Sequence, residues 1–361
     1  MDTSDKEKET YSIKNGDIFL TRTSEVVDEL AMSCVAVKDY PSASYSGFLK
    51  RLRPTQTDIT YSKFMAFYLR SPMFRKTMTN NAVMTLRASL NEAIFSYLDL
   101  LLPDYDDQVK VGDLLYLLNE KIELNNRINA ELEVMAKTLY DYWFVQFEFP
   151  DANGKPYKTS GGKMVYNPTL KREIPEGWSD KTLSQIANIT MGQSPEGSSY
   201  NQEGVGTIFY QGSTDFEWLF PAPRQYTTAP SRMAKKGDIL LSVRAPVGDM
   251  NIANTDCCIG RGLAALNSKI GSDGFLFYVM KYFKQIFDRR NSEGTTFGSI
   301  TKNDLHSLTL VYPTADLLKK YDDVVTSYNK MIFERSLENR ELISLRDWLL
   351  PMLMNGQVTV K

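Results

Sequence analysis

Leu98-Asp99-Leu100-Leu101-Leu102-Pro103 returns 210 positions later as Leu308-Thr309-Leu310-Val311-Tyr312-Pro313, and a long helical pattern follows each proline. Thr85-Leu86-Arg87-Ala88-Ser89 and Thr295-Thr296-Phe297-Gly298-Ser299 precede the two copies at the same offset. Farther upstream, Gly16-Asp17-Ile18-Phe19-Leu20 matches Gly237-Asp238-Ile239-Leu240-Leu241. A duplicated domain and helix with a divergent interior predicts two similar readers of two different targets, held apart by a spacer.

The segments after the two prolines carry heptad patterns, from Tyr105 to about Phe144 and from Asp316 to Met354. In the first segment, one heptad position holds Val111, Leu118, Leu132 and Leu139, and the other holds Leu114, Ile128, Met135 and Tyr142. In the second, Tyr321, Tyr328, Leu342 and Leu349 stand against Val324, Met331, Leu345 and Met352. Such a pattern predicts coiled-coil packing.

Polar residues interrupt both stripes at matching places, with Lys121 and Asn125 in the first and Arg335 and Glu338 in the second. This predicts a polar layer that fixes register or meets a partner. A helix of about 38 residues is roughly 57 Å long, much longer than usual in globular proteins, and favours a spacer. The alternative is an amphipathic helix packed on its own domain.

The regions before the helices favour mixed α+β domains. Strand-like runs occur at Asp17 to Thr21 and Met32 to Val37. Helical spacing occurs at Tyr61 to Arg75 and again at Gly274 to Phe287. Residues 1 to about 10 are expected to be a disordered charged leader. Residues 151–176 are expected to form a connector with a small hairpin.

Composition argues against a globally basic nucleic-acid-binding protein, a disulfide-stabilised protein and a membrane-spanning protein. The net charge of −2 and the pI of about 5.7 provide no global basic field, so binding to nucleic acid must depend on local patches or on a complex. Cys34 and the pair Cys257-Cys258 lack CxxC spacing, which favours a reducing compartment. No apolar run approaches the roughly 18 residues needed to span a bilayer. We therefore expect a cytoplasmic protein without membrane association.

Catalytic motifs are missing from the sequence. His306 is the single histidine and lies in a strand-like run, where a packing or surface role is expected. There is no GxxxxGK[ST] loop. Asn167-Pro168-Thr169-Leu170 departs at its third residue from the Asn or Asp-Pro-Pro-aromatic motif of amino-methyltransferases. We expect a protein that is not an enzyme and that binds neither a cofactor nor a metal by itself.

Polar loops interleaved with Arg, Gln, Ser and aromatic residues suit reading of the DNA major groove. Gln can bridge the N6/N7 edge of adenine, Arg the O6/N7 edge of guanine, and hydroxyl groups hold phosphates. Each such residue taken alone is also compatible with a solvated loop. The candidate DNA-binding residues of the second copy are Gln193, Ser194, Tyr200, Gln211, Ser213, Arg244, Arg261, Ser299 and Lys302, and those of the first are Arg22, Thr23, Arg87 and Ser89.

The sequence resembles the DNA specificity subunits of type I restriction-modification systems. The resemblance covers nearly the whole chain, and its motifs occur in the family's order. They are Met191-Gly192-Gln193-Ser194-Pro195, Tyr200-Asn201, Tyr210-Gln211-Gly212, residues 236–244, residues 296–300, and the connector from Tyr142-Trp143-Phe144 to Ile174-Pro175-Glu176-Gly177-Trp178.

This resemblance implies an α+β protein with two target-recognition domains, the first one incomplete, joined by two long antiparallel coiled-coil spacer helices. The expected boundaries are 1–103 for the partial first domain, 104–147 for the first spacer helix, 148–176 for the connector, 177–313 for the second domain and 314–361 for the second helix and tail. The resemblance also implies three partners: double-stranded DNA, type I adenine methyltransferase (modification) subunits, and restriction (motor nuclease) subunits in the full phage-defence complex.

The first domain is expected to be incomplete because Gly16-Asp17 comes so early in the chain. In the second copy, residues 178 to about 231 precede Gly237-Asp238 and contain Gln193, Ser194, Tyr200 and Gln211. The main expectation is a subunit that directs type I methyltransferase and restriction subunits to a bipartite site. The alternative is an assembly or interfering subunit that binds the methyltransferase but cannot direct specific modification. The recognised DNA sequence does not follow from residue types.

Overall fold

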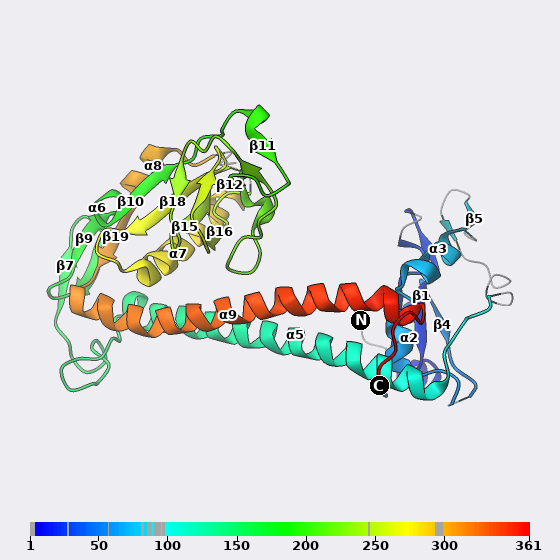
Figure 1. Ribbon diagram of the computed structural model, residues 1–361. Coiled ribbons are helices and arrows are strands. Elements are labelled where there is room, and N and C mark those ends of the chain that lie inside the picture. Colours follow the sequence, from blue (N-terminus) through cyan, green and yellow to red (C-terminus); the bar gives the residue numbers. More distant parts are fainter. Residues whose placement is uncertain are drawn as a thin grey trace. The chain divides into compact units, whose positions relative to one another are not determined.

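The computed structural model describes residues 4–26, 29–56, 58–80, 83–84, 88–89, 95, 98–244, 246–292 and 299–361. Contacts divide the chain into unit 1, residues 1–125 with 338–361, and unit 2, residues 126–337. Each unit contains part of both long helices that Figure 1 shows. Among the described residues, no helix is long and apolar enough to cross a membrane.

Unit 1 is built around a three-stranded antiparallel sheet. Its central strand β1 (Ile18–Thr21) lies between β3 (Ser33–Val35) and β4 (Leu49–Leu52). Helices α2 (Ser62–Tyr68) and α3 (Pro72–Asn80) supply the buried Phe64, Phe67, Tyr68 and Phe74 that the helical spacing predicted. The expected single helix is broken into two because Pro72 cannot continue an α-helical hydrogen-bond ladder. A second sheet has the order β2 (Thr23–Ser24), β6 (Ala88–Ser89), β5 (Val83–Met84).

Unit 2 contains two larger sheets and smaller strand pairs. One sheet has the order β10 (Ala187–Met191), β18 (Leu263–Ser268), β15 (Ile239–Ser242), β16 (Met250–Ile252). The other has the order β11 (Tyr200–Asn201), β13 (Tyr226–Thr227), β12 (Thr207–Tyr210), β17 (Cys257–Ile259), β14 (Met233–Ala234). The expected connector hairpin is confirmed as β7 (Met164–Asn167) with β8 (Arg172–Pro175), and β9 (Ser179–Thr182) pairs with β19 (Thr309–Tyr312).

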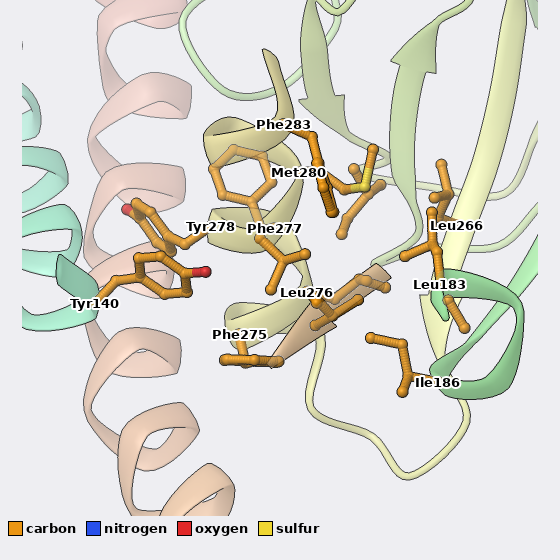
Figure 2. Close-up of a cluster of buried hydrophobic side chains, with 14 of the residues drawn as sticks. Tyr140, Leu183, Ile186, Leu266, Phe275, Leu276, Phe277, Tyr278, Met280 and Phe283 are labelled. Carbon is orange, nitrogen blue, oxygen red and sulfur yellow. The ribbon is translucent and has the colours of Figure 1, made fainter. Parts of the chain in front are cut away.

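The main core of unit 2 lies around helix α7 (Asp273–Ser292), the helix predicted at 274–287. Figure 2 shows its side chains between the strands and the long helices, with Tyr278 beside Tyr140. The rings of Tyr140 and Tyr278 are stacked with centroids 6.0 Å apart. Together with Tyr321, they form an aromatic cluster between α7 and the long helices, in which the rings of Tyr140 and Tyr278 each meet that of Tyr321 edge to face. The short helix α6 (Leu183–Ile186) closes the other side with Leu183 and Ile186.

The sequence repeat is also a repeat of backbone geometry. Gly16 and Gly237 both have positive φ, and each donates its N–H to the carbonyl of an alanine that directly follows a strand of its sheet, Ala36 after β3 in unit 1 and Ala253 after β16 in unit 2. β1 pairs with β4 as β15 pairs with β18, with Ile18 opposite Leu52 and Ile239 opposite Leu266. The aspartate that follows each glycine is buried, and it accepts from Arg53 in unit 1 and from Asn267 in unit 2.

The two long helices are α5 (Tyr105–Tyr140), continued by the π-helical turn η2 (Asp141–Val145), and α9 (Ala315–Met354). Their bounds confirm the predicted helices. In unit 1 they run antiparallel, because Asn119 contacts Arg346 while Asn125 contacts Asn339. In unit 2 the Tyr321 hydroxyl donates to the Ala136 carbonyl at 3.1 Å, so the helices also contact each other there.

The predicted heptad is correct at one position and wrong by one residue at the other. The first position is buried or half-buried, as at Val111 and Leu132. At the second position, Met135, Tyr142, Met331 and Leu345 are exposed, and Leu114, Ile128, Val324 and Met352 are half-buried. The side chains that fill that position are Leu115, Ile122, Asn129 and Ala136 on α5 and Val325, Ile332, Asn339 and Leu353 on α9. The prediction failed because polar asparagines, Asn129 and Asn339, interrupt the buried position. The residues one place earlier gave a more regular apolar heptad in the sequence.

The expected polar layer is present in unit 1, although its members differ in part. Asn125 is buried and donates to Glu338 at 2.8 Å and to Asn339 at 2.9 Å, and Lys121 forms an ion pair with Glu338 at 3.3 Å. Asn339 is a member that the sequence pattern did not identify. Arg335 belongs to unit 2 and donates to the Met331 carbonyl of its own helix.

Two further expectations are corrected by local capping. The leader is not disordered throughout, since α1 spans Asp5–Thr10 and begins with a capping box between Ser4 and Glu7. His306 lies in helix α8 (Lys302–Ser307) rather than in a strand, because Thr301 and Asp304 form another capping box. Both capping boxes are local sequence signals, but a prediction based on apolar runs does not take them into account.

Candidate nucleic-acid interface

Four strands of unit 2 end at the same edge. Met191 at the end of β10 pairs with Ala264, and Ser242 at the end of β15 pairs with Leu263. β10 and β15 therefore both end beside the start of β18. β12 and β17 are parallel and end side by side, with Tyr210 paired with Ile259. The turn Gly260 to Gly262 links β17 to β18. The loops that follow all four strands therefore converge on one edge.

Backbone hydrogen bonds join these loops to one another. Gln193 donates to the Ile259 carbonyl at 3.0 Å, and Gly260 donates to the Tyr210 carbonyl at 2.8 Å. Gly262 donates to the Gln211 carbonyl at 3.2 Å and accepts from Val243 at 2.9 Å. The loops are thus held by main-chain contacts, which leaves the side chains available for a ligand.

Glycines allow this close approach. A Cβ on Gly192 would lie 2.1 Å from the Gly260 carbonyl oxygen, and a Cβ on Gly262 would lie 2.6 Å from the Gln211 carbonyl oxygen. Both distances are below any real carbon–oxygen contact, and both neighbours are backbone atoms that cannot rotate away. The glycines are therefore required for the packing of the loops.

The converging loops expose the polar side chains that the sequence predicted. Gln193, Gln211, Arg244 and Arg261 are exposed, and Ser194 is half-buried between them. The Ser194 hydroxyl contacts Gln211 Oε1 at 3.0 Å and the Arg261 backbone N–H at 3.3 Å. The structure therefore brings these predicted residues, which come from separate segments, into one surface.

Arg244 is connected to the segment before α8. Arg244 forms a β-bridge with Ser299, and Ile300 donates to the Val243 carbonyl at 2.8 Å. Ser299 is exposed, as is Lys302 at the first position of α8. Residues 293–298 of the predicted loop lie outside the described residues.

Tyr200 and Ser213 are placed differently from the exposed residues. The Tyr200 hydroxyl donates to the Pro195 carbonyl at 2.9 Å, and its ring lies 4.9 Å from that of Phe209. These contacts hold the 195–200 loop in shape and occupy the phenol within the domain. Ser213 is half-buried at the start of a short 3-10 helix that follows Gln211 and Gly212.

Unit 1 reproduces part of this edge. Thr23 pairs with Ser89 as Arg244 pairs with Ser299. Thr23 and Arg244 are corresponding positions of the sequence repeat, and so are Ser89 and Ser299. Arg22 is exposed and donates its backbone N–H to the Phe48 carbonyl at 3.0 Å. Arg87 and the side chain of Ser89 lie outside the described residues.

Ser231 and Arg232 belong to the same surface and were not predicted. The Ser231 hydroxyl donates to the Gln193 carbonyl at 2.5 Å, and Ile259 donates to the Arg232 carbonyl at 2.9 Å. Arg232 is exposed and adds a third guanidinium to those of Arg244 and Arg261. Its position beside β17 follows from the pairing of β14, which sequence spacing does not reveal.

The side chains exposed at this edge suit binding of nucleic acid. Burial raises the pKa of the Cys257 thiol of β17 to about 12, so this thiol stays protonated at neutral pH. Within the described residues, no group of three His, Cys, Asp or Glu side chains could hold a metal ion. An edge rich in Arg and Gln matches the donors and acceptors of base edges and phosphates.

Comparison with known proteins gives consistent similarities. Residues 3–134 and 175–332 match the model of the type I restriction modification DNA specificity domain, one segment for each copy of the repeat. The chain is 30% identical over 316 residues to the putative type I restriction enzyme MjaX specificity subunit of Methanocaldococcus jannaschii, covering 86% of this chain and 71% of that protein. It is 24% identical over 332 residues to the HindI specificity subunit of Haemophilus influenzae, covering 73% and 70%.

A solved structure shares the fold. The crystal structure of the S subunit of a type I restriction-modification system from M. genitalium aligns with a TM-score of 0.65 at 16% identity, covering 95% of this chain and 84% of that one. This similarity supports the α+β architecture with long helices.

Proposed function

Since the chain belongs to the type I restriction-modification DNA specificity family, we propose that it reads a bipartite DNA site and directs adenine methyltransferase subunits to it. As a specificity subunit it is a non-catalytic component that recognises DNA sequence. Restriction subunits would join the same assembly in the full complex. The methyl donor and the base-flipping pocket would then belong to the partner subunits.

The observation that carries this proposal is the convergence of Gln193, Gln211, Arg244 and Arg261 on one edge of unit 2. Arg and Gln are the side chains with the best bidentate match to guanine and adenine in the major groove. They lie on loops fixed by strand ends and glycine contacts, which restricts how far each side chain can move. The positive charge is local, consistent with the net charge of −2.

The domain assignment remains part of the proposal. Residues 1–103 and 177–313 would be the two recognition domains, and 104–147 and 314–361 would contain the spacer helices. Helices of 36 and 40 residues are roughly 54 to 60 Å long at 1.5 Å per residue. At 3.4 Å per base pair this corresponds to about 17 base pairs, enough for two half-sites on successive turns of DNA.

The long helices also expose apolar side chains that suit a protein partner. On the described part of the chain, the exposed large apolar residues of these helices include Leu117, Leu124, Val134, Met135 and Trp348. Trp348 is 64% exposed and Val134 63% exposed. Contact with methyltransferase subunits would cover them.

A second candidate is an assembly or interfering subunit that binds the methyltransferase without directing specific modification. A difference between the units favours it: in unit 2 a five-stranded sheet carries Gln211, and the described residues of unit 1 include no such sheet. Competition binding of the assembled methyltransferase against a randomised bipartite DNA library separates the two functions. An enriched two-part motif supports directed recognition, and binding of methyltransferase without any motif supports interference.

A further inference from the structure

The hydroxyl group of Ser194 connects two loops of the proposed interface in a defined direction. Its oxygen lies 3.3 Å from the backbone nitrogen of Arg261 and 3.0 Å from Oε1 of Gln211. A backbone N–H can only donate, so Ser194 accepts from Arg261. The single hydroxyl proton is then free to point at Gln211, and the hydroxyl donates it to the amide oxygen Oε1.

Gly260 provides the space in which this amide oxygen lies. A Cβ on Gly260 would come within 2.6 Å of Gln211 Oε1 and 2.9 Å of its Cδ. The backbone of Gly260 is itself held by a hydrogen bond to the Tyr210 carbonyl at 2.8 Å. The amide oxygen is therefore turned toward the protein by the Ser194 hydroxyl, in the space that the absent side chain of Gly260 leaves.

The amide nitrogen of Gln211 consequently faces away from these groups. The Gln211 side chain is exposed, and Nε2 has no hydrogen-bond partner among the described residues. Two N–H donors are thus presented to solvent, while the acceptor end of the same amide is occupied. A free glutamine can offer one donor and one acceptor together, and this one cannot.

We propose that Gln211 is a donor-only reader that selects a keto base, guanine or thymine, and that Ser194 is its positioning residue. This inference rests on the proposed function. In the major groove, guanine presents the acceptors N7 and O6, and thymine presents O4. Cytosine presents only the amino donor N4, and adenine presents the amino donor N6 beside its acceptor N7, so a donor-only amide cannot make the bidentate pair with adenine and would meet an amino donor at either base. The usual pairing of glutamine with adenine is therefore disfavoured at this position.

The test uses the full chain assembled with its modification subunit and a randomised bipartite DNA library. Gln211→Ala identifies the base pair concerned, because its preference should flatten by about tenfold at one position only. Ser194→Ala should admit adenine at that same base pair, since the amide can then turn over. Ser194→Thr keeps the hydroxyl and should keep the keto preference. Gln211→Glu replaces donors by acceptors and should shift the preference toward cytosine or adenine.

Ser199→Ala serves as the matched control, because it removes a hydroxyl of the same domain that bonds to Thr227 at 2.7 Å. It should leave the motif unchanged. A motif that keeps its keto preference in Ser194→Ala, or that shows adenine opposite Gln211 in the parent, would overturn the inference while the proposed function stands. A parent complex that enriches no motif at all would overturn the proposed function and this inference with it. Thermal unfolding of each variant separates loss of reading from loss of fold.

Discussion

The side-chain amide of Asn125 donates a hydrogen bond to Oδ1 of Asn339 at 2.9 Å, joining α5 to α9 in a buried position of unit 1. The same amide also donates to Glu338. A buried amide paired across two helices can form these bonds in one register only. The pair therefore fixes the register of α5 against α9 more than it stabilises the fold.

We expect Asn125→Ala to lower the free energy of unfolding by about 1–3 kcal/mol, because the buried hydrogen bonds from Asn125 to Glu338 and Asn339 would be lost. Urea denaturation of the full chain measures this change. Glu123→Ala, an exposed neighbour on the same helix, should change stability by less than about 0.5 kcal/mol. Equal effects of the two substitutions would show that the layer contributes nothing to stability.

The corrected seam is tested by two adjacent residues of α9. Ile332 is 1% exposed and Met331 is 36% exposed. Ile332→Asp buries a carboxylate in the core of unit 2 and should cost about 3–5 kcal/mol, whereas Met331→Asp should cost less than about 1 kcal/mol. Thermal or urea unfolding distinguishes them. The reverse order of stability would restore the heptad position expected from the sequence.

The Asp17 pair predicts an acid-sensitive unit 1. Burial acts to raise the pKa of the Asp17 carboxyl, but hydrogen bonds from Arg53 and from the Lys14 backbone outweigh it and hold the pKa below its ordinary value. The stabilisation is therefore present above the unfolded pKa of about 3.9 and is lost as pH falls through the folded pKa. Urea midpoints measured from pH 7 to pH 3 should fall for the parent and fall less steeply for Asp17→Asn. Parallel curves would contradict this assignment.

Arg244 and Lys302 should have different effects on DNA binding. Arg244 lies on the converging edge, so Arg244→Ala should relax the preference at one base pair by about 1–3 kcal/mol if the contact is bidentate. Lys302 is exposed at the start of α8, and Lys302→Ala should weaken binding to all sequences alike and reduce the salt dependence. Salt titrations of the assembled methyltransferase on motif and non-motif DNA measure both effects. A change of base preference in Lys302→Ala would reassign that residue to readout.

The isolated chain should not bind S-adenosylmethionine. Its Asn167-Pro168-Thr169-Leu170 segment departs from the amino-methyltransferase motif, and Asn167 is engaged with Asp180 and Leu170 in the connector hairpin. Calorimetry should detect binding only after the modification subunit is added. Tight binding to the chain alone would contradict a non-catalytic role.

The candidate site was predicted in its residue types but not in its arrangement. Gln193, Gln211, Arg244 and Arg261 stood out because polar loops with glycines followed strand-like runs. Their meeting depends on the pairing of β10, β15 and β18 and on the parallel pair β12 and β17, which join segments far apart in the chain. The role of Tyr200 in shaping its own loop and the presence of Arg232 in the surface depend on the same pairing.

The sequence by itself determined the features that depend on local periodicity and on comparison of the chain with itself. These are the repeat with its Gly-Asp turns, the bounds of the two long helices and the connector hairpin. Tertiary structure alone decided which residues form the second heptad position of the seam, because Asn129 and Asn339 carry no apolar signal yet are buried. It also decided the direction of the Gln211 amide, since that direction depends on Ser194, Gly260 and Arg261, which belong to other strands' loops and meet only in the folded domain.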